Sequence, residues 1–519
     1  MNLTIIEIAK ACGGTLVLQG DRTKGDANVS AVAIDSRKAE AGGVFVAVSG
    51  ERVDGHRFVG NVYEKGIVLT VVEKSPEEVE KEHGIPKDKW GSYLMVKDSL
   101  QALRDMAEAY RRKLDVKVVG ITGSAGKTST KELTAAVLSE KYKVLKTEGN
   151  LNNEIGVPLT LLRIRQEHQV AVVEMGISDF GEMHRLSKMA RPDICVITNI
   201  GQSHLKDLKT RDGILKAKSE IFDYMAQDGE ICLNGEDDKL IEVREINGRR
   251  PHFFGLGGDS SEEVLVEESI GRGLWGSDAT MLMKKGVLRN KESLQEVRVQ
   301  VHIPLPGSHM LQNAAAAACV AGLLGLTGEE IAAGMAKAAP VGGRDNLIRL
   351  PRNTFIDGCY NANPASMKAA IDLLALADTK KVAILGDMFN LGENSHDYHG
   401  EMGAYAVEKG VDLIICVGEE SRHMYAEAQR SMEEARICER AENSDERQGY
   451  LCCGTECSAE EKTQRAVYFP DRKALMEALN SGLGDLVPEG ATVLVKASHG
   501  MEFIEVLDFL QNSAAVEKP

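Results

Sequence analysis

Residues 121–132 read ITGSAGKTSTKE and decide how the centre of this chain folds. The apolar run VKVVG precedes them, and the helical pattern STKELTAAVL follows from residue 129. This pattern predicts a buried strand, a glycine turn and a helix that opens with Lys-Thr. In such a setting backbone N–H groups and the helix dipole bind phosphate. A Walker A loop has four residues between its glycines, whereas Gly123 lies three positions before Gly126 and Ile121 stands where the first glycine would be. The stretch predicts a nucleotide phosphate site of a shorter type, with an ordinary glycine-rich turn as the alternative.

Bulk composition bounds the class of protein. The 519 residues are enough for about three domains, and 43% hydrophobic with 27% charged residues is typical of a globular protein. The net charge of −16, from 78 acidic and 62 basic residues, argues against a general nucleic-acid surface, which needs basic clusters. A local pocket for an anionic small molecule is still compatible with this charge.

No signal peptide or membrane span is predicted. Glu7 and Lys10 lie near the start and no apolar h-region follows them, and no run reaches the roughly 20 apolar residues of a span. The run AAAAACVAGLLGL, residues 314–326, is shorter and predicts a buried helix. We therefore expect a cytoplasmic protein without membrane insertion.

Ten cysteines are spread along the chain, and most lie in apolar runs, as reduced structural thiols do in the cytosol. The exception is YLCCGTECSAE, which carries Cys452, Cys453 and Cys457. It has no C-x-x-C pair and no nearby histidine, so a solvated surface insertion near residues 440–466 is favoured over a zinc site.

Three sections of the chain differ in pattern and predict an α/β protein of three domains. Residues 1–97 hold short apolar strands between polar turns and predict a small α/β domain. Residues 98–341 alternate buried strands with helices, which predicts a parallel sheet around the phosphate loop. Within them EVRVQVHIPLPG, residues 296–307, alternates polar and apolar side chains and predicts an antiparallel edge. Residues 342–519 predict a smaller Rossmann-like unit.

Further motifs sharpen this interpretation. They are AIDSRKAEAGGVFVAVSGERVDGHRF (33–58), TEGNLNNEIGVPLTLL (147–162), VVEMGISDFGEM (172–183), ITNIGQSHL (197–205), KAKSEIF (216–222), GRDN (343–346), CYNANPASMKAAI (359–371) and ILGDM (384–388). With the loop, they resemble the Mur ligase family of ATP-dependent amide-forming enzymes. The resemblance covers nearly the whole chain in the family's order, and NLNNEIG and YNANP are more specific to it than the loop.

The resemblance implies ATP and two Mg²⁺ ions as cofactors. The implied nucleotide contacts are Gly123, Ser124, Ala125, Gly126, Lys127, Thr128, Ser129, Asn313, Arg344 and Asp357. The implied metal ligands are Thr128, Glu174, His204 and Lys218. Glu174 ends a buried strand beside the loop, and carboxylate oxygens suit Mg²⁺. Lys127 and Arg344 would bind phosphate oxygens, the arginine in a bidentate manner.

Lys218 carries the sharpest implication, because it matches the lysine that bears a carbamate in this family. Carbamoylation needs a neutral amine, so the site must lower a pKa whose reference value is about 10.4. The alternative is a solvated helix lysine, with Lys216 two residues away at the matching position. The implied catalytic set is Lys127, Glu174, His204, Lys218 and Arg344.

Substrate contacts are implied in all three sections. The implied residues are Ser36 and Arg37 for the UDP end, Asn150, Asn152 and Asn153 for the peptide end, and Asn361, Asn363 and Ser498 for the amino substrate. Turn-forming asparagine is the alternative role for the first group of asparagines. The chain departs from the family pattern at Met310, Gly358, Ala497 and His499.

The implied reaction joins D-alanyl-D-alanine to UDP-N-acetylmuramoyl-tripeptide through an acyl phosphate, and yields the UDP-linked pentapeptide, ADP and phosphate for peptidoglycan synthesis. A monomer with one domain for UDP, one for ATP and one for the amino substrate is expected. The alternatives are a ligase of the same superfamily that adds a single amino acid, a P-loop NTPase acting as a switch or motor, and an inactive scaffold. Intact Lys127, Thr128, Glu174 and Lys218 argue against the scaffold.

Overall fold

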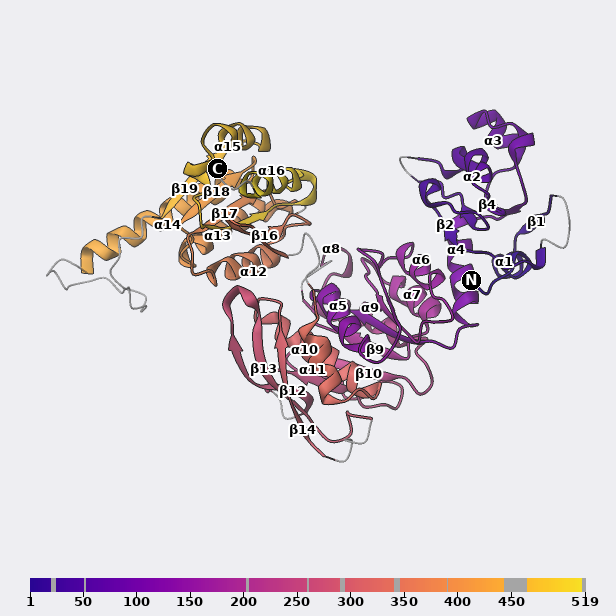
Figure 1. Cartoon of the computed structure of the whole chain (residues 1–519), viewed down its shortest axis with the longest axis horizontal. Helices are drawn as coiled ribbons and strands as arrows, with labels where there is room; N and C mark the ends of the chain where they lie inside the picture. Colours follow the sequence, from indigo (N-terminus) through magenta and orange to yellow (C-terminus); the bar gives the residue numbers. More distant parts are fainter. Residues whose placement is uncertain are drawn as a thin grey trace. The chain divides into compact units, whose positions relative to one another are not determined.

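Three β-sheets organise the chain in the computed structural model, which describes residues 1–19, 25–50, 53–201, 205–258, 261–289, 295–339, 346–389, 391–442 and 464–515 (Figure 1). The sheets have five, nine and six strands, which confirms the predicted α/β class. The chain divides into two compact units. One is Met1–Ser269, Asp278–Ile303 and His309–Ala338, and the other is Ile270–Ser277, Pro304–Ser308 and Ala339–Pro519. The first unit contains residues 1–97 and most of residues 98–341, and the boundaries of the predicted domains stay a prediction.

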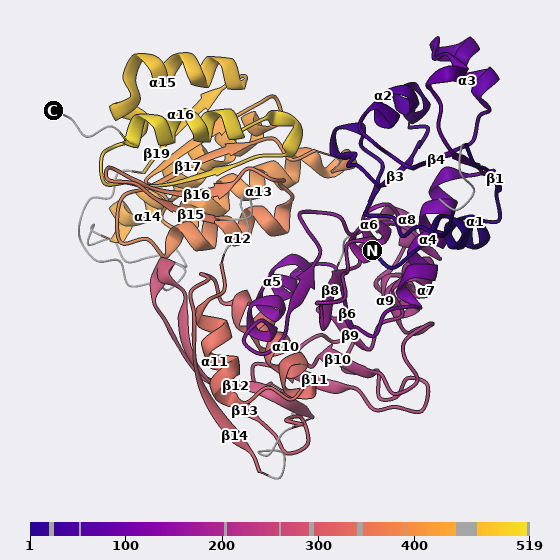
Figure 2. The ribbon, with the colours of Figure 1, turned by 45° about the vertical axis from the view of Figure 1, so that its right-hand side comes forward.

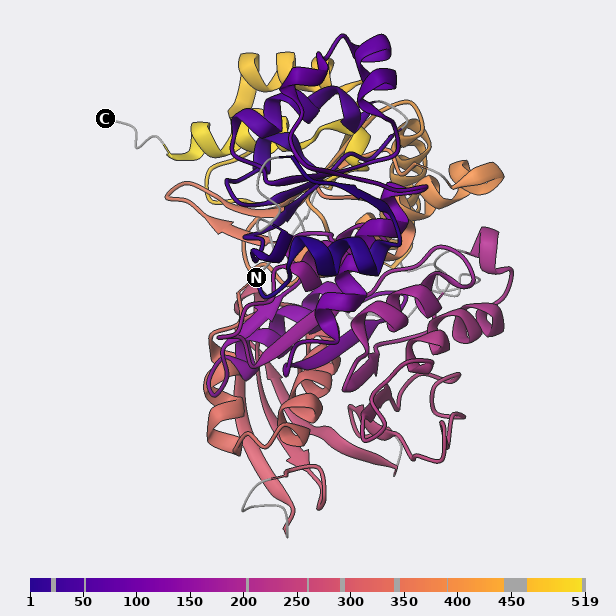
Figure 3. The same ribbon diagram turned by 90° about the vertical axis from the view of Figure 1, so that its right-hand side faces the viewer.

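The five-stranded sheet is built from short strands that are mostly parallel. They are β1 (Thr15–Val17), β2 (Val32–Ala33), β3 (Val44–Val46), β4 (Leu69–Val72) and β5 (Tyr93–Met95), in the order β1-β5-β4-β3-β2 with β1 antiparallel. The helices beside them are α1 (Ile5–Cys12), α2 (Val59–Glu64), α3 (Pro76–His83) and α4 (Ser99–Arg111). Figure 3 shows this sheet in indigo between helices on both sides. Ile8 and Met106 pack with one face and Val59 and Val79 with the other, so successive strand residues are all buried.

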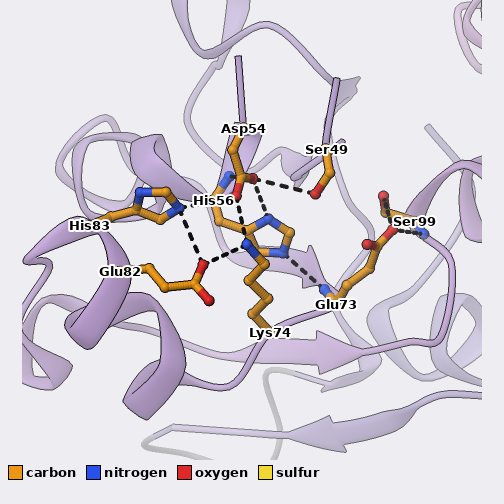
Figure 4. A network of polar contacts seen from close by, with 8 residues as sticks. All are labelled: Ser49, Asp54, His56, Glu73, Lys74, Glu82, His83 and Ser99. Atoms are coloured by element: carbon orange, nitrogen blue, oxygen red, sulfur yellow. Dashed lines mark hydrogen bonds and ion pairs between the residues drawn. The ribbon is translucent and has the colours of Figure 1, made fainter. Parts of the chain in front are cut away.

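A network of polar side chains ties this sheet to its helices (Figure 4). Asp54 accepts hydrogen bonds from His56 Nδ1 at 2.7 Å and from Lys74 Nζ at 2.8 Å. His56 is fully buried, and its Nε2 accepts the Glu73 backbone N–H at 3.0 Å, so Nδ1 carries the proton. The Glu73 carboxylate accepts the Ser99 N–H and hydroxyl, both at 2.7 Å, and links β4 to the start of α4.

The same network holds an internal cation. Lys74 Nζ lies 2.8 Å from Asp54 and 2.6 Å from Glu82, and His83 Nε2 lies 3.0 Å from Asp54. Partial burial would raise the pKa of Asp54, but hydrogen bonds from Lys74 and His56 hold that pKa well below its usual range. Asp54, Glu82 and His83 have the composition of a metal site. Here the positive charge between the two carboxylates is the Lys74 ammonium.

The nine-stranded sheet forms the centre of the first unit. Its strands are β6 (Lys117–Thr122), β7 (Val144–Lys146), β8 (Val170–Glu174), β9 (Ile194–Ile197), β10 (Glu230–Asn234), β11 (His252–Gly255), β12 (Glu262–Gly271), β13 (Ser277–Met283) and β14 (Val297–Ile303), in the order β14-β13-β12-β11-β10-β9-β6-β8-β7. The seven strands β6 to β12 all pair in parallel with their neighbours among these strands. The short turn 272–276 joins β12 to its neighbour β13, and only an antiparallel pair can have so short a connection. β14 lies at the edge of the sheet, as its alternating pattern predicts.

Helices cover the central sheet on both sides (Figure 2). They are α5 (Lys127–Leu138), α6 (Gly156–Leu162), α7 (Glu182–Ala190), α8 (Leu205–Leu208), α9 (Arg211–Ser219), α10 (His309–Leu323) and α11 (Gly328–Ala336). α5 packs against α10 and α11, while α6, α7 and α9 join the core beneath β6, β8 and β9. The alanine-rich run forms α10, whose residues Ala314–Leu323 are buried, which confirms the predicted buried helix. In the part of the chain that is described, no helix is both long and apolar enough to cross a bilayer.

The second unit is built on the six-stranded sheet. Its strands are β15 (Asn346–Arg349), β16 (Thr354–Gly358), β17 (Lys381–Gly386), β18 (Leu413–Val417), β19 (Arg465–Phe469) and β20 (Thr492–Lys496), in the order β15-β16-β20-β17-β18-β19 with β15 antiparallel. The helices are α12 (Pro364–Ala375), α13 (Ser395–Glu408), α14 (Ser421–Glu442), α15 (Arg472–Leu486) and α16 (Ile504–Ala515). Ala383 and Leu385 pack with α12, α13 and α14, and the alternating Val382 and Ile384 pack with α15 and α16.

The described cysteines agree with the predicted reduced state. Cys12, Cys195, Cys232, Cys319, Cys359 and Cys416 are free, and all but Cys12 are buried. The predicted surface insertion, with Cys452, Cys453 and Cys457, falls within residues 443–463, outside the described part of the chain.

Replacing His56 by alanine tests the polar network. The Glu73 N–H loses its acceptor, and an unpaired buried amide costs about 1–3 kcal/mol. We expect the Glu73 amide hydrogen to exchange with solvent about tenfold faster or more, as measured by NMR. His83→Ala is the control, because it removes a side chain that is 22% exposed and leaves the Glu73 bond in place. Unchanged exchange in His56→Ala would contradict the network.

Candidate functional site

The turn between β6 and α5 has a backbone that only glycine accommodates. Gly123 has φ +149° and Gly126, the N-cap of α5, has φ +79°. A Cβ on Gly123 would lie 1.9 Å from Thr198 Oγ1, and one on Gly126 would lie 2.8 Å from Asn313 Oδ1. Both glycines are therefore required twice over, by conformation and by close packing.

The end of β9 holds this loop in place. The backbone N–H groups of Ser124 and Ala125 donate to Asn199 Oδ1 at 3.1 and 2.8 Å, and Thr198 Oγ1 donates to the Ala125 carbonyl at 2.5 Å. Lys127 Nζ donates to the Gly123 carbonyl at 2.9 Å. Strand β9 is the parallel neighbour of β6, so both strands end at the same edge. Thr198 and Asn199 belong to the motif ITNIGQSHL, but the spacing along the chain gives no sign of their contact with the loop, because that contact depends on strand order.

Hard oxygen donors gather beside the loop. Thr128 is 3% exposed and its hydroxyl donates to Glu174 Oε1 at 3.1 Å. Asn152 Nδ2 donates to the same oxygen at 2.9 Å. Glu174, at the end of β8, is 1% exposed, and its Oε2 is buried without a hydrogen bond. A buried carboxylate whose Oε1 lies beside a threonine hydroxyl and a phosphate-type loop is a donor set that fits a Mg²⁺ ion.

Lys218 is buried, whereas Lys216, the alternative candidate for the carbamate, is not. It lies near the end of α9 with 2% exposure, while Lys216 is exposed. Burial, together with the smaller effect of the nearby Lys127 ammonium, lowers the pKa of Lys218 to about 7. Among the described residues no carboxylate lies within ion-pair distance of it. A substantial neutral fraction near neutral pH is what carbamoylation needs, so the environment favours Lys218 over Lys216.

Three predicted peptide-end asparagines lie on the segment after β7. Asn152 bonds to Glu174 and also donates to Asn150 Oδ1 at 2.9 Å. Asn153 Oδ1 accepts the N–H groups of Ile155 and Gly156, at 3.2 and 2.9 Å, at the start of α6. Asn150 and Asn152 therefore lie together beside the metal-type cluster, whereas Asn153 has a capping role of its own.

The remaining predicted nucleotide contact of the first unit lies behind the loop. Asn313 is in α10, 7% exposed, and its Oδ1 accepts from Thr130 Oγ1 at 3.1 Å. Ser129 is half-buried in the first turn of α5. The close approach of Asn313 to Gly126 places this side chain against the loop backbone.

The predicted UDP contacts lie at the carboxyl end of β2. Ser36 and Arg37 form the short 3₁₀ helix Ser36–Lys38, which Asp35 caps. Arg37 pairs with Asp35 at 2.7 Å and its side chain is 88% exposed. Lys65 Nζ donates to the Ser36 carbonyl at 2.6 Å. An exposed guanidinium at this edge of a parallel sheet is placed to meet an anionic ligand.

The predicted contacts of the second unit gather at the carboxyl ends of β16 and β20. Asp357 is 5% exposed and accepts the Cys359 N–H at 3.1 Å. Asn361 is exposed, and Asn363 caps α12 through the Ser366 N–H at 2.8 Å. Ser498 is 3% exposed, and its hydroxyl accepts the Phe389 N–H at 2.8 Å. His204 and Arg344 lie outside the described residues.

One buried charge beside Glu174 has no role in the sequence-based assignment. Lys131, one turn after Lys127 in α5, is 1% exposed, and its Nζ lies 3.7 Å from Glu174 Oε2. Its spacing from Lys127 put both lysines on the same side of the helix, but a lysine in a helix is usually solvated, and only the packing reveals its burial.

Comparison with known proteins places the whole chain in one family context. Residues 121–321 match the description "Mur ligase middle domain", residues 343–499 "Mur ligase, glutamate ligase domain", and residues 28–111 "Mur ligase family, catalytic domain". The UDP-N-acetylmuramoyl-tripeptide--D-alanyl-D-alanine ligase of Bacillus subtilis (strain 168) is 32% identical over 516 residues, 98% of each chain.

Solved structures are similar over the same length. A crystal structure of MurF from Acinetobacter baumannii covers 98% of this chain and 99% of its own, with TM-score 0.79 and 29% identity. A crystal structure of the MurF ligase of Thermotoga maritima in complex with ADP covers 93% of this chain and 97% of its own, with TM-score 0.69 and 25% identity.

Replacing Gly123 by alanine tests the loop. The Cβ collides with Thr198 Oγ1 and the backbone conformation costs about 1–3 kcal/mol. We expect the affinity for ADP, measured by calorimetry, to fall about tenfold or more. Adding Thr198→Ala removes the colliding oxygen and should restore part of the loss.

Gly84→Ala is the matched control for backbone strain. Gly84 has φ +69° and nothing within 4 Å of its Cβ position, so ADP affinity should match the wild type. Equal ADP binding by Gly123→Ala and the wild type would rule out this loop as the phosphate site.

Proposed function

This chain belongs to the Mur ligase family, and from that premise we propose that it is the ATP-dependent ligase that joins D-alanyl-D-alanine to UDP-N-acetylmuramoyl-tripeptide. The product is the UDP-linked pentapeptide used in peptidoglycan synthesis. Among the Mur ligases, this choice is supported by the 32% identity, over 98% of each chain, with the UDP-N-acetylmuramoyl-tripeptide--D-alanyl-D-alanine ligase of Bacillus subtilis. The Thr128–Glu174 pair beside the glycine loop, and the buried Lys218 on which the Lys127 charge acts, support the same chemistry from the residues themselves.

The reaction must activate a carboxylate, which is a poor electrophile. Transfer of the ATP γ-phosphoryl group to the tripeptide's terminal carboxylate forms an acyl phosphate and releases ADP. The free amine of D-alanyl-D-alanine then attacks the acyl carbon, and the tetrahedral intermediate expels phosphate as the amide bond forms. Both steps concentrate negative charge, so fixed cations and N–H donors accelerate them electrostatically.

The central residues supply that environment. We assign the phosphates to the backbone of Gly123, Ser124, Ala125 and Gly126 and to the ammonium of Lys127, which now bonds to the loop carbonyl and can reach a phosphate oxygen instead. Mg²⁺ ions, when bound, neutralise phosphate oxygens and orient them. We assign them to Thr128, Glu174, His204 and carbamoylated Lys218, with Arg344 as a further phosphate contact.

The three predicted domains receive distinct ligands in this proposal. Ligands of open parallel sheets bind at the carboxyl ends of the strands. Ser36 and Arg37 stand there in the first sheet and would hold the UDP end, and Asn150 and Asn152 would meet the peptide end. In the second unit Asn361 and Ser498 occupy the equivalent edge and would bind the amino substrate. We further propose a cytoplasmic monomer, because the reaction uses ATP and UDP-linked precursors.

A paired-substrate assay tests the function. We expect phosphate release from ATP to require UDP-N-acetylmuramoyl-tripeptide and D-alanyl-D-alanine together, with each pentapeptide formed accompanied by one phosphate. The tripeptide is offered with diaminopimelate or lysine as its third residue. Phosphate release without either substrate indicates an NTPase, and release with a single amino acid in place of the dipeptide indicates another ligase. Either result contradicts the proposal.

Carbamoylation of Lys218 has its own test. The pKa of about 7 leaves more of the amine neutral as pH rises through 7, so carbamate should form readily at pH 8 and poorly at pH 6. We expect ¹³C-labelled bicarbonate to give a carbamate NMR signal in the wild type at pH 8 that Lys218→Met lacks. Lys216→Met, which removes an exposed lysine of the same helix, should keep the signal. An identical signal in Lys218→Met would refute the assignment.

A further inference from the structure

We propose that Lys131 is a positioning residue that holds segment 147–153, the proposed peptide-end contact, in register with the nucleotide site. The proposal rests on the function given above. It concerns a buried lysine that the reaction itself does not use, and it links two groups of side chains that belong to different substrates.

Lys131 points into the protein, and its ammonium contacts other groups than the loop carbonyl that Lys127 contacts. It is 1% exposed, and lysine is almost never fully buried unless it is paired. Its Nζ lies 2.9 Å from the Thr147 carbonyl, 3.0 Å from Glu132 Oε1 and 3.7 Å from Glu174 Oε2. An ammonium has three N–H donors, and three groups surround this one: Glu132 of α5, Glu174 of β8 and Thr147, the residue after β7.

Thr147 is the first residue of the segment, and its bonds attach it to both α5 and β8. The residue is fully buried. Its N–H donates to the Val172 carbonyl at 3.0 Å, and its hydroxyl accepts the Glu174 N–H at 3.0 Å. Its carbonyl accepts from Lys131. Thr147 is therefore attached to β8 by its own atoms and to α5, which opens at the phosphate loop, by the lysine.

The far end of the segment returns to the same carboxylate. Asn152 Nδ2 donates to Glu174 Oε1 at 2.9 Å, and the Asn152 carbonyl accepts the Gly176 N–H at 2.8 Å. A Cβ on Gly176 would lie 3.1 Å from the Asn152 carboxamide, so the fit is close. The segment therefore contacts Glu174 at both Thr147 and Asn152, and the bond from Lys131 to the Thr147 carbonyl holds its first residue.

The charge of Lys131 also orients Glu174. Oε1 receives the Thr128 hydroxyl and the Asn152 amide, whereas Oε2 accepts no hydrogen bond and faces the ammonium. A buried carboxylate needs a compensating charge, and loss of one partner leaves the other unpaired in a water-poor site. Lys131 thus keeps Oε1 toward the loop and keeps the segment at a fixed distance from it.

Loss of Lys131 should therefore affect the peptide substrate more than the nucleotide. The Ser124 and Ala125 N–H groups bond to Asn199, and Lys127 bonds to the Gly123 carbonyl, whereas Lys131 contacts Thr147 and two carboxylates. We therefore expect binding of ADP alone to depend little on Lys131. A structural role without positioning would lower the folded fraction and leave the properties of the remaining folded enzyme unchanged. Positioning changes substrate affinity and turnover in enzyme that is folded.

The experiment compares Lys131→Met with the wild type in the full-length chain. We expect the dissociation constant of UDP-N-acetylmuramoyl-tripeptide, measured by calorimetry without nucleotide or Mg²⁺, to rise about tenfold, and kcat to fall roughly 10–100-fold. The affinity for ADP without Mg²⁺ should change by less than about threefold. Lys131→Arg, which keeps the charge and the donors, should recover part of both losses.

Lys146→Met is the matched control. Lys146 pairs with the same Glu132 from strand β7, but its side chain is 46% exposed, and its removal should leave all three quantities at wild-type values. Should Lys131→Met fail to fold in thermal melts, Lys131→Gln, which keeps one N–H donor and no charge, is measured in the same way.

The outcomes separate the two proposals. If the wild type shows no phosphate release dependent on both substrates, the proposed function fails. If the wild type is active and folded Lys131→Met or Lys131→Gln binds the tripeptide nucleotide and turns over like the wild type, the positioning role is wrong. A loss of equal size in ADP affinity would also overturn it.

Discussion

The turn from β6 into α5 is the constraint on which the rest of the site depends. Thr198 and Asn313 press against the two glycine positions so closely that no side chain fits there. The close packing fixes the direction of α5 and leaves its first N–H groups at the carboxyl edge of the sheet. Because β8 and β9 flank β6 in parallel, their last residues meet at that edge. Glu174 and Asn199 are beside the loop for this reason.

Near that turn the protein buries two lysines, Lys131 and Lys218, whose charged neighbours differ. Lys131 lies against two carboxylates and a carbonyl, which are acceptors for the donors of its side chain. Lys218 is equally buried, but Lys127 is its charged neighbour, so burial and repulsion lower its pKa to about 7. Two lysines of similar burial therefore suit different work: one to hold the structure together, the other to react as a neutral amine.

The five-stranded and six-stranded sheets also carry their predicted contact residues at the carboxyl ends of parallel strands, with fewer buried charges there. In the first sheet the network of Asp54, His56 and Lys74 braces the carboxyl edge near which Arg37 is exposed. In the second unit Asp357 and Ser498 are buried at strand ends. Asn153 and Asn363 show how a residue chosen by motif can have a structural reason to be there, since Asn363 caps α12 and Asn153 accepts N–H groups at the start of α6. Their position beside a ligand edge and their capping bonds are compatible.

The sequence by itself determined the α/β class, most strands and helices, the glycine turn between β6 and α5, and the family. Apolar periodicity and glycine spacing are local properties that a linear pattern records, as the agreement at β6, β10 and α10 illustrates. Motif resemblance also singled out Thr128 and Glu174, which the structure joins by a hydrogen bond, and Lys218, which the structure buries; that they form one metal site stays a prediction. Only the tertiary structure decided which lysine is buried, that Lys131 joins Thr147 to Glu174, and that Asn199 holds the loop. Those facts depend on strand order and on the exclusion of water, and neither is written in the spacing of residues along the chain.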